Sequence, residues 1–490
     1  CDEAQPVCQR CAKSRRICDG RQAFIVHTEN PYASGQKKRP RGPRSTRKSE
    51  PATTLHALLP RQPLDLQAEA VVYYVRFYLH SPKDALPLLS AHCAPSDLQP
   101  GRTLQIECQL VNLAISSIAL ALFSRTQQCP QAGVQAAAQY QKLLQLLQLT
   151  LISLNQNNIE SCLLAISHMG LYENAIYRPQ KQGNASLSMA LPSMPHDEGA
   201  LVLLKFWKEH LSLRQPATNV VKTIRREAIK HALLGKVALP EWMKDGAAFG
   251  EDGLALEYDT ILIRIASVRQ RLSALFQYKS SRQPDAKELA GLAEPLNQEA
   301  QDIDQALQDW RMNFPNAWSY TRHRLPTHRL WPKTSFFSPE VSVYRRLEDA
   351  AVWARYFSSR MLVLSTRLSI LQNIEVNPDS LQHEQSSGCR FKLQATAASL
   401  ASTVPFCLER FKFANGPDLA DQDITLNKSE ITTNPYAAGL VTNPLVTASS
   451  IVSHLPKEQK SWFQSQLAQL GRVSGFGIFE IATTERWSDL

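Results

Sequence analysis

The chain has 490 residues, of which 43% are hydrophobic and 20% are charged, and its formal net charge is +10. The charge is unevenly placed: residues 1–50 carry 12 Lys and Arg against 5 Asp and Glu, whereas the rest of the chain carries 42 against 39. This excludes a strongly basic body, so the basic character belongs to the first 50 residues. From about residue 66 the composition is that of a folded protein, large enough for a substantial core.

The first 18 residues, CDEAQPVCQRCAKSRRIC, contain four cysteines among arginine and lysine side chains. Cys8 and Cys11 are separated by two residues, a spacing that lets one tight turn present two thiolates to one metal ion. Cys1 and Cys18 each stand seven residues from this pair. Nearby positive charge favours the thiolate, which is the form that binds zinc. The pattern therefore predicts zinc ligands at all four positions.

Two other interpretations of the four cysteines stay open. A secreted protein would use them in disulfides, yet the other six cysteines are scattered through apolar segments like buried free thiols, at positions 93, 108, 129, 162, 389 and 407. A self-contained zinc site with four cysteines usually has two close pairs of ligands, whereas this block has one.

The block resembles the later part of the fungal binuclear zinc-cluster DNA-binding domain, in which six cysteines hold two zinc ions. On this likeness Cys1, Cys8, Cys11 and Cys18 are the third to sixth ligands. The intervening segment 2–7, which is acidic and contains Pro6, is typical of the family's linker between its two halves. The resemblance thus implies two zinc ions in the parent protein and double-stranded DNA as its partner.

The chain departs from the family pattern before its first cysteine. The family's first two cysteines and the basic helix that reads bases have no counterpart here, so the resemblance implies a chain truncated within the cluster, with both zinc sites incomplete. We expect weak zinc binding and no sequence-specific recognition by this chain. The basic residues that remain are candidates for phosphate contacts rather than base readout: Arg10, Lys13, Arg15 and Arg16.

Residues 35–50, GQKKRPRGPRSTRKSE, hold no apolar residue able to build a core and include two prolines. The composition predicts a disordered arm. Such an arm suits nuclear import, and the same charges strengthen DNA binding by releasing counterions. A solvated linker between two domains is the alternative interpretation. The residues that would act are Lys37, Lys38, Arg39, Arg41 and Arg44.

Apolar periodicity predicts a helical body throughout residues 66–490, with no alternating run long enough to require a sheet. The most apolar of the expected helices, Leu104–Phe123, should be a central buried helix rather than a membrane span, because Glu107 and Asn112 interrupt it. We expect loops at 180–195 and 414–435. The expected helices are Ala68–His80, Leu104–Phe123, Val134–Leu154, Ile159–Tyr177, Gly199–Leu213, Asn219–Leu234, Leu254–Tyr278, Ala286–Asn313, Glu340–Ile374, Arg390–Phe413, Lys457–Ser474 and Gly477–Trp487.

The body also resembles, diffusely, the fungal-specific transcription-factor domain that commonly follows the zinc cluster. The likeness lies in the segment 309–318, with its Asp-Trp and Phe-Pro-Asn-Ala-Trp sequences, and in the helix 352–362. Trp353, Tyr356 and Arg360 fall on one face of that helix. We expect core packing there, with an internal hydrogen bond from Arg360, rather than ligand binding.

The sequence holds no positive signal for catalysis: it lacks a phosphate-binding glycine loop, a Gly-x-Ser-x-Gly elbow and a His-Glu-x-x-His helix. Asp197 is expected to cap the helix after it. A coiled coil after the cluster is also not expected, because Pro51, Pro60 and Pro63 interrupt the segment. A dimer through the helical body stays undecided.

These features predict an all-α protein with three parts: a partial zinc cluster (1–21), a basic disordered linker (22–65) and a large helical regulatory domain (66–490). The function they imply is that of a nuclear, zinc-dependent, sequence-specific DNA-binding regulator of RNA polymerase II transcription, of the fungal type, with transcription co-regulators as further partners. No membrane association and no enzymatic activity are expected. The alternative is a helical interaction scaffold or corepressor that does not read DNA.

Overall fold

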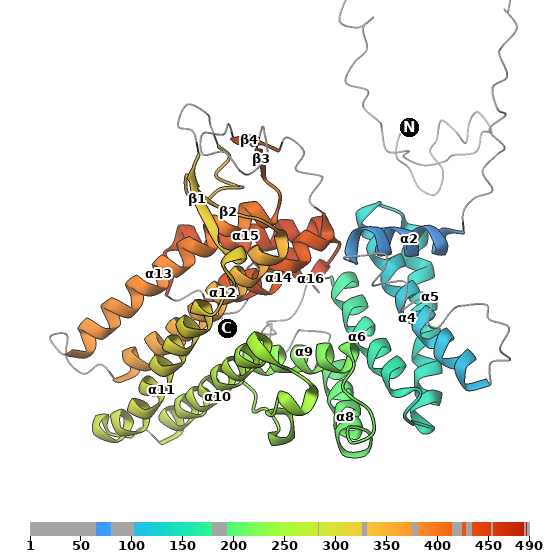
Figure 1. The fold of residues 1–490 in the computed structure, drawn as a ribbon, viewed down its shortest axis with the longest axis horizontal. Coiled ribbons are helices and arrows are strands. Elements are labelled where there is room, and N and C mark those ends of the chain that lie inside the picture. The colour runs from blue at the N-terminus through green and yellow to red at the C-terminus, as the bar shows by residue number, and fades with distance from the viewer. Residues whose placement is uncertain are drawn as a thin grey trace, which may run out of the picture. The chain divides into compact units, whose positions relative to one another are not determined.

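Helices dominate the structure, which is a computed structural model of the chain. It describes residues 65–79, 102–178, 194–282, 284–325, 331–374, 381–413, 424–427, 434–451, 454–484 and 487. All of these lie in one compact unit, Pro63–Leu490. Thirteen α-helices and only four short strands occur in these residues, so the all-α prediction is confirmed (Figure 1).

The first helices of the unit are arranged around one apolar helix. That helix, α4, packs against α2, α5 and α6. Its segment Gln109–Thr126 is, among the described residues, the one stretch long and apolar enough to span a membrane, yet 67% of it is buried inside the protein. The prediction of a central buried helix is therefore confirmed. The bounds are α2 (Leu66–Tyr78), α4 (Arg102–Thr126), α5 (Pro130–Ile152), α6 (Ile159–Ile176), α8 (Met194–His210) and α9 (Asn219–Gly235).

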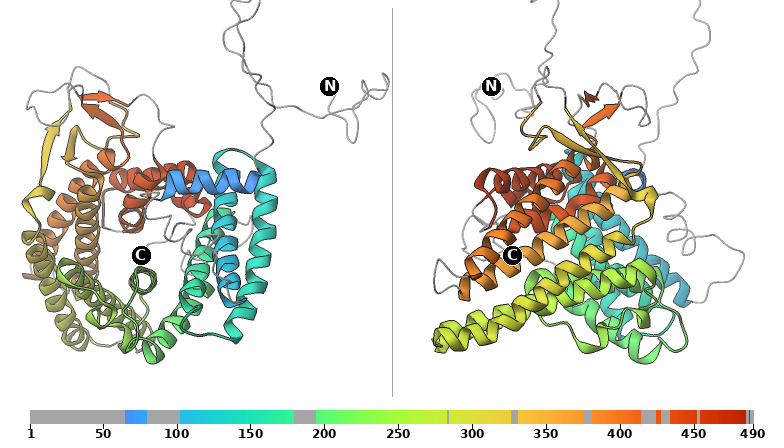
Figure 2. Two further views of the ribbon diagram at one scale, coloured as in Figure 1. Left: turned by 45° about the vertical axis from the view of Figure 1, so that its right-hand side comes forward. Right: turned by 60° about the vertical axis from the view of Figure 1, so that its left-hand side comes forward.

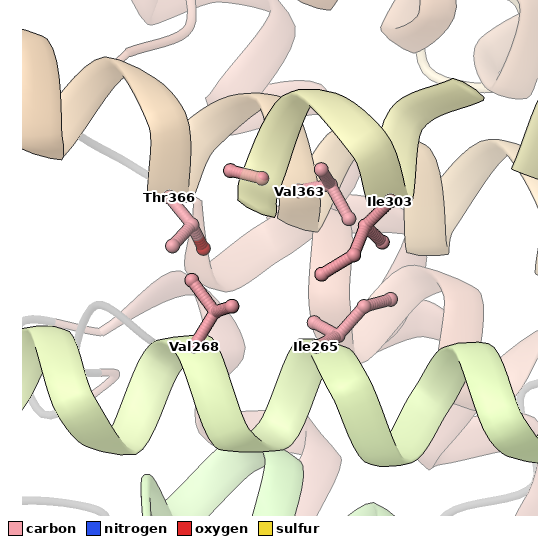
Figure 3. Close-up of a pocket in the computed structure, with 6 residues that line it drawn as sticks. Ile265, Val268, Ile303, Val363 and Thr366 are labelled. Carbon is pink, nitrogen blue, oxygen red and sulfur yellow. The ribbon is translucent and has the colours of Figure 1, made fainter. Parts of the chain in front are cut away.

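The later helices form the largest hydrophobic core of the unit. Its centre is α12, which packs against α11, α13 and α14. Where α10, α11 and α12 meet, Ile265 and Val268 face Ile303, Val363 and Thr366, with no room for a water molecule between them (Figure 3). The bounds are α10 (Gly253–Arg282), α11 (Ala286–Met312), α12 (Leu347–Ile374), α13 (Leu381–Cys407), α14 (Pro435–Ser450), α15 (Lys457–Ser474) and α16 (Gly477–Glu480).

The first and last helices of the unit lie side by side, although about 400 residues separate them (Figure 2). The Tyr78 hydroxyl donates a 2.8 Å hydrogen bond to the carbonyl oxygen of Ser474, and Arg125 forms an ion pair with Glu480. At Gly477 the backbone approaches α6 so closely that a Cβ atom would collide with the Tyr177 carbonyl oxygen. A glycine is therefore required at this contact by the lack of space.

Two small antiparallel sheets replace parts of two expected helices. β1 (Tyr320–Arg324) pairs with β2 (Glu340–Tyr344), and β3 (Phe411–Phe413) pairs with β4 (Ile424–Leu426). The predicted start of one helix at Glu340 and the predicted end of another at Phe413 were therefore wrong. In β2 the β-branched Val341 and Val343 are buried against the side chains of both sheets, and this packing favours a strand.

Three further expectations need correction. Helix α8 begins at Met194, inside the expected loop 180–195, whose other residues lie outside the described parts except Pro195. The expected loop 414–435 contains the strand β4 and the start of α14. The last expected helix is shorter: α16 is followed by a 3₁₀ turn. The 3₁₀ turns are η1 (Glu241–Met243), η2 (Ala247–Phe249), η3 (Asn316–Trp318) and η5 (Ile481–Thr483).

Helix α14 was not expected at all, because Gly439 and Pro444 give its sequence a low helix propensity. Burial outweighs that propensity: most of the helix lies against α12 and α15. Its start is favourable as well, since the Asn434 side chain accepts a 3.1 Å hydrogen bond from the backbone N–H of Tyr436.

Candidate functional site

All residues predicted from the sequence to bind zinc or DNA lie outside the described residues. These are the cysteines Cys1, Cys8, Cys11 and Cys18, the phosphate-contact candidates Arg10, Lys13, Arg15 and Arg16, and the arm residues Lys37, Lys38, Arg39, Arg41 and Arg44. Their roles therefore stay predictions. In the part of the chain that the structure describes, no group of three or more His, Cys, Asp or Glu is placed to hold a metal ion.

Four of the scattered cysteines can be placed, and none of these four forms a disulfide. Cys162, Cys389 and Cys407 are buried, whereas Cys129 is half-buried. Burial raises the pKa of Cys389 to about 11 and that of Cys407 to about 12. These two thiols are therefore protonated at neutral pH and poorly suited to metal binding or nucleophilic chemistry.

The aromatic residues that carried the resemblance in the body form part of the core. The indole N–H of Trp353 donates to the Trp318 carbonyl oxygen at 2.7 Å. Tyr356 is 2% exposed. The guanidinium of Arg360 donates from Nε to Asp304 Oδ1 at 2.7 Å. The prediction of core packing with an internal hydrogen bond from Arg360 is confirmed.

In a second buried arginine, Arg225 of α9, each of the three guanidinium nitrogens donates a hydrogen bond. Its Nη1 and Nη2 donate to the two carboxylate oxygens of Asp259 at 2.8 and 2.9 Å. Nε and Nη2 donate to the Met243 carbonyl oxygen at 3.0 and 2.7 Å. The guanidinium also lies 4.9 Å from the ring centre of Phe249. A pair this well satisfied is structural, because removing either partner leaves a buried charge.

A polar cluster joins α5, α6 and α8. The Tyr140 hydroxyl donates to Glu173 Oε1 at 2.6 Å, and His196 Nε2 lies 2.9 Å from the same oxygen. Burial alone would raise the pKa of Glu173, but the hydrogen bonds from His196 and Tyr140 outweigh it and the pKa is lowered. Because the two partners share one carboxylate oxygen, the cluster acts as a tie between three helices.

The sequence suggested that the neighbouring Asp197 caps the helix after it, but Asp197 is not the cap of α8. It lies inside the first turn of the helix, where its charge still suits the helix N-terminus. Its carboxylate forms an ion pair with His231 of α9. The prediction placed the helix start too late, and the residue instead links two helices.

A polar cavity of about 70 Å³ lies where the end of α9 meets α10 and α12. Four hydroxyl side chains and two cationic side chains line it, together with an apolar wall, and the described lining residues include no carboxylate. The lining residues are Lys236, Arg269, Leu272, Ser273, Phe276, Ser365, Thr366 and Ser369. Hydroxyl and cationic side chains beside an apolar wall are an arrangement that can hold a small polar ligand.

Arg269 is the central group of this polar cavity and is only 5% exposed. Its Nε donates to the Leu233 carbonyl oxygen at 3.0 Å, and Nη1 lies 3.4 Å from the Thr366 hydroxyl. Its Nη2 is buried and has no hydrogen-bond partner among the residues that the structure describes. Burial lowers the pKa of Arg269 to about 10, so the side chain stays charged at neutral pH.

Arg269 was missed at the sequence level, although a signal for it exists. It occupies a core position in the apolar stripe of its helix, between Ile265 and Leu272 at helical spacing. Arginine is almost never fully buried without a partner, so an arginine in such a stripe marks a group that needs one. What the sequence does not reveal is that α12 brings hydroxyl groups to the same place.

Comparison of the chain with protein-family models, curated proteins and solved structures finds no match to any of them.

Proposed function

We propose that this chain belongs to a zinc-dependent nuclear regulator that binds double-stranded DNA and controls transcription by RNA polymerase II. The observation that carries the proposal is the spacing of Cys1, Cys8, Cys11 and Cys18 with basic residues between them. Thiolates at this spacing suit zinc, and the interleaved cations suit phosphate. The proposal rests on the sequence and on the resemblance stated for it.

In this proposal the three parts of the chain have different tasks. Zinc–thiolate bonds hold the small module that meets DNA, and its basic residues grip phosphates. The basic arm adds affinity that depends on salt rather than on sequence. The helical unit would act as the regulatory domain, where ligands or co-regulators are sensed.

Zinc binding is tested with cobalt(II), which reports thiolate ligands by its absorbance, and with zinc content per chain. We expect the chain to bind the metal through these thiolates, and Cys8→Ser to abolish that binding, because Cys8 belongs to the close pair Cys8 and Cys11. Cys129→Ser is the matched control, since Cys129 is a free thiol of the helical unit. Equal metal binding by both variants would remove the zinc-cluster assignment.

DNA binding is tested by fluorescence anisotropy on a mixed-sequence duplex at salt concentrations of about 50 to 200 mM. The slope of the logarithm of affinity against the logarithm of salt concentration reports the number of phosphate contacts. Replacing the five arm cations by glutamine should flatten that slope, by up to about 4.5 for five lost contacts. The control replaces five exposed cations of the helical unit: Lys205, Lys279, Arg282, Lys287 and Lys392.

The two sets of variants separate the proposal from the scaffold alternative. Loss of salt-dependent binding in the arm variant alone supports a DNA-binding regulator. If neither set changes a weak affinity, the chain does not engage DNA through its N-terminal segment, and a helical interaction scaffold becomes the better description.

A further inference from the structure

The polar cavity at the end of α9 contains a buried donor without an acceptor. Buried N–H groups are nearly always hydrogen-bonded, because an unsatisfied one has lost its hydration without a replacement, and the penalty is larger when the group is charged. Arg269 Nη2 is such a group, and it belongs to a side chain that is 5% exposed. The guanidinium therefore needs an acceptor that the described protein does not supply.

The neighbouring hydroxyls add donors that are not otherwise engaged. The side chains of Ser273 and Ser369 line the cavity and make no hydrogen bond to any other described residue. Thr366 donates to the Leu362 carbonyl oxygen at 2.8 Å, so its hydroxyl is fixed in place. Ser365 is held in turn by His454 Nδ1 at 3.0 Å. Two hydroxyls thus remain to orient toward an occupant.

The charge of the cavity selects the sign of that occupant. Arg269 and Lys236 both line it, and no carboxylate is among the described residues that line it. The C-terminal end of α9, where Leu233 and Lys236 lie, offsets about half a unit of positive charge. The Arg269 guanidinium therefore gives the cavity a positive charge, and in a partly buried site that charge acts at a low effective dielectric constant.

The size of the cavity limits the ligand further. A volume of about 70 Å³ corresponds to roughly two water molecules at 30 Å³ each. It therefore suits a compact group of a few heavy atoms. Leu272 and Phe276 form an apolar side of the cavity, which can contact a carbon substituent on such a group.

We propose that this cavity binds a small oxyanion, namely a phosphate, sulfate or carboxylate group, through the Arg269 guanidinium and the Ser273 and Ser369 hydroxyls, with Lys236 adding charge. Guanidinium binds such groups with two parallel N–H donors, and Arg269 has one of its terminal nitrogens without any partner. The site is independent of the proposed zinc and DNA functions, because all its residues lie in the helical unit.

Lys236 offers a variant that removes charge without damaging the fold. Its backbone is left-handed, with φ of 54°, and it forms the C-cap of α9. Glycine is the residue that such a position prefers. Lys236→Gly should therefore raise the Tm of the free protein slightly while it weakens oxyanion binding, so that stability and binding move in opposite directions.

The site is tested by isothermal titration calorimetry with inorganic phosphate, sulfate and acetate. Sodium chloride keeps the ionic strength constant in each titration. We expect saturable binding of at least one of the three, and the order among them separates a tetrahedral oxyanion from a carboxylate. Lys236→Gly should weaken that binding about tenfold, because it removes one cation from the lining of the cavity and Lys236 is only half-buried.

A matched serine pair provides the second arm of the experiment. Ser369→Ala removes a lining hydroxyl and should weaken binding several-fold, whereas Ser281→Ala changes an exposed serine of α10 outside the cavity and should change nothing. Absence of saturable heat for all three anions would overturn the proposal and leave a water-filled cavity. Equal affinities in Lys236→Gly, Ser369→Ala and the unaltered protein would place any binding elsewhere and overturn it too.

Discussion

The environments of Arg225 and Arg269 show how differently one molecule can bury the same side chain. Both arginines lie where α9 and α10 pack together, and they are 0% and 5% exposed. Arg225 has a bidentate carboxylate, a carbonyl and an aromatic ring as partners. Arg269 has one carbonyl and one distant hydroxyl. Burial alone therefore does not reveal the role of an arginine; the saturation of its donors does.

The largest expected effect on stability is that of Arg225→Met, and Arg269→Met is the matched variant with which it is compared. Arg225→Met leaves Asp259 as a buried carboxylate without its partner and should cost about 3–5 kcal/mol of unfolding free energy. Arg269→Met strands no carboxylate and removes an unsatisfied buried donor, so we expect a change within about 1 kcal/mol. Urea unfolding of the two variants measures both values.

The result of that pair bears directly on the oxyanion proposal. A large cost for Arg269→Met, similar to that for Arg225→Met, would show that Arg269 is needed to hold α9 on α10. Its main role would then be structural. A small cost, together with lost oxyanion binding, would show that the side chain is kept buried for its ligand.

An intermediate effect is expected at Asp304, whose partner Arg360 is less buried than Arg225. The Arg360 side chain is 19% exposed and that of Asp304 is 6% exposed. Burial alone would lower the pKa of Arg360, but the hydrogen bond and charge of Asp304 outweigh it and the pKa is raised. Asp304→Asn should destabilise the protein by about 1–3 kcal/mol, as for hydrogen bonds to charged groups.

Asp309→Asn is the control for this measurement, because Asp309 lies on the same helix, is exposed and contacts only Gln305 among the described residues. We expect its unfolding free energy to change by less than about 0.5 kcal/mol. Equal effects at the two positions would mean that the buried pair contributes no more than a surface contact, and the graded comparison of arginine sites would fail.

The sequence predicted well those elements whose signal is local. Helix α4 was identified because its apolar residues continue around most of its surface, and α15 because its periodicity is clear from Lys457 to Ser474. Helix α14 was missed, since Gly439 and Pro444 argue locally against a helix that only tertiary burial stabilises. The strand β2 was missed because it is five residues long and directly precedes a helix.

The polar sites were less predictable for the same reason. Asp259 stands 34 residues from Arg225, and the hydroxyls of α12 stand about 100 residues from Arg269, so no local pattern pairs them. Arg360 was an exception because its position on an aromatic helix face already implied an internal partner. The zinc and DNA residues had the strongest local pattern of all, yet they lie outside the described residues, and their assignment stays a prediction.

The smallest expected effect concerns His231 of α9, whose charge depends on pH. Burial alone would lower its pKa, but the hydrogen bond and charge of Asp197 outweigh it, and the pKa is raised. The stabilisation from the ion pair is therefore fully present below the unfolded pKa of about 6.5 and is lost as pH rises through the higher folded value.

We expect the unaltered protein to be more stable than Asp197→Asn at pH 6 by less than about 1 kcal/mol, as for a partly exposed pair, and this advantage to shrink toward pH 8.5. Urea midpoints of both proteins across that range measure the difference. His168 and His454 have lowered pKa values and oppose this trend, but they are present in both proteins and cancel. A difference that stays constant with pH would show that His231 is uncharged in the folded protein.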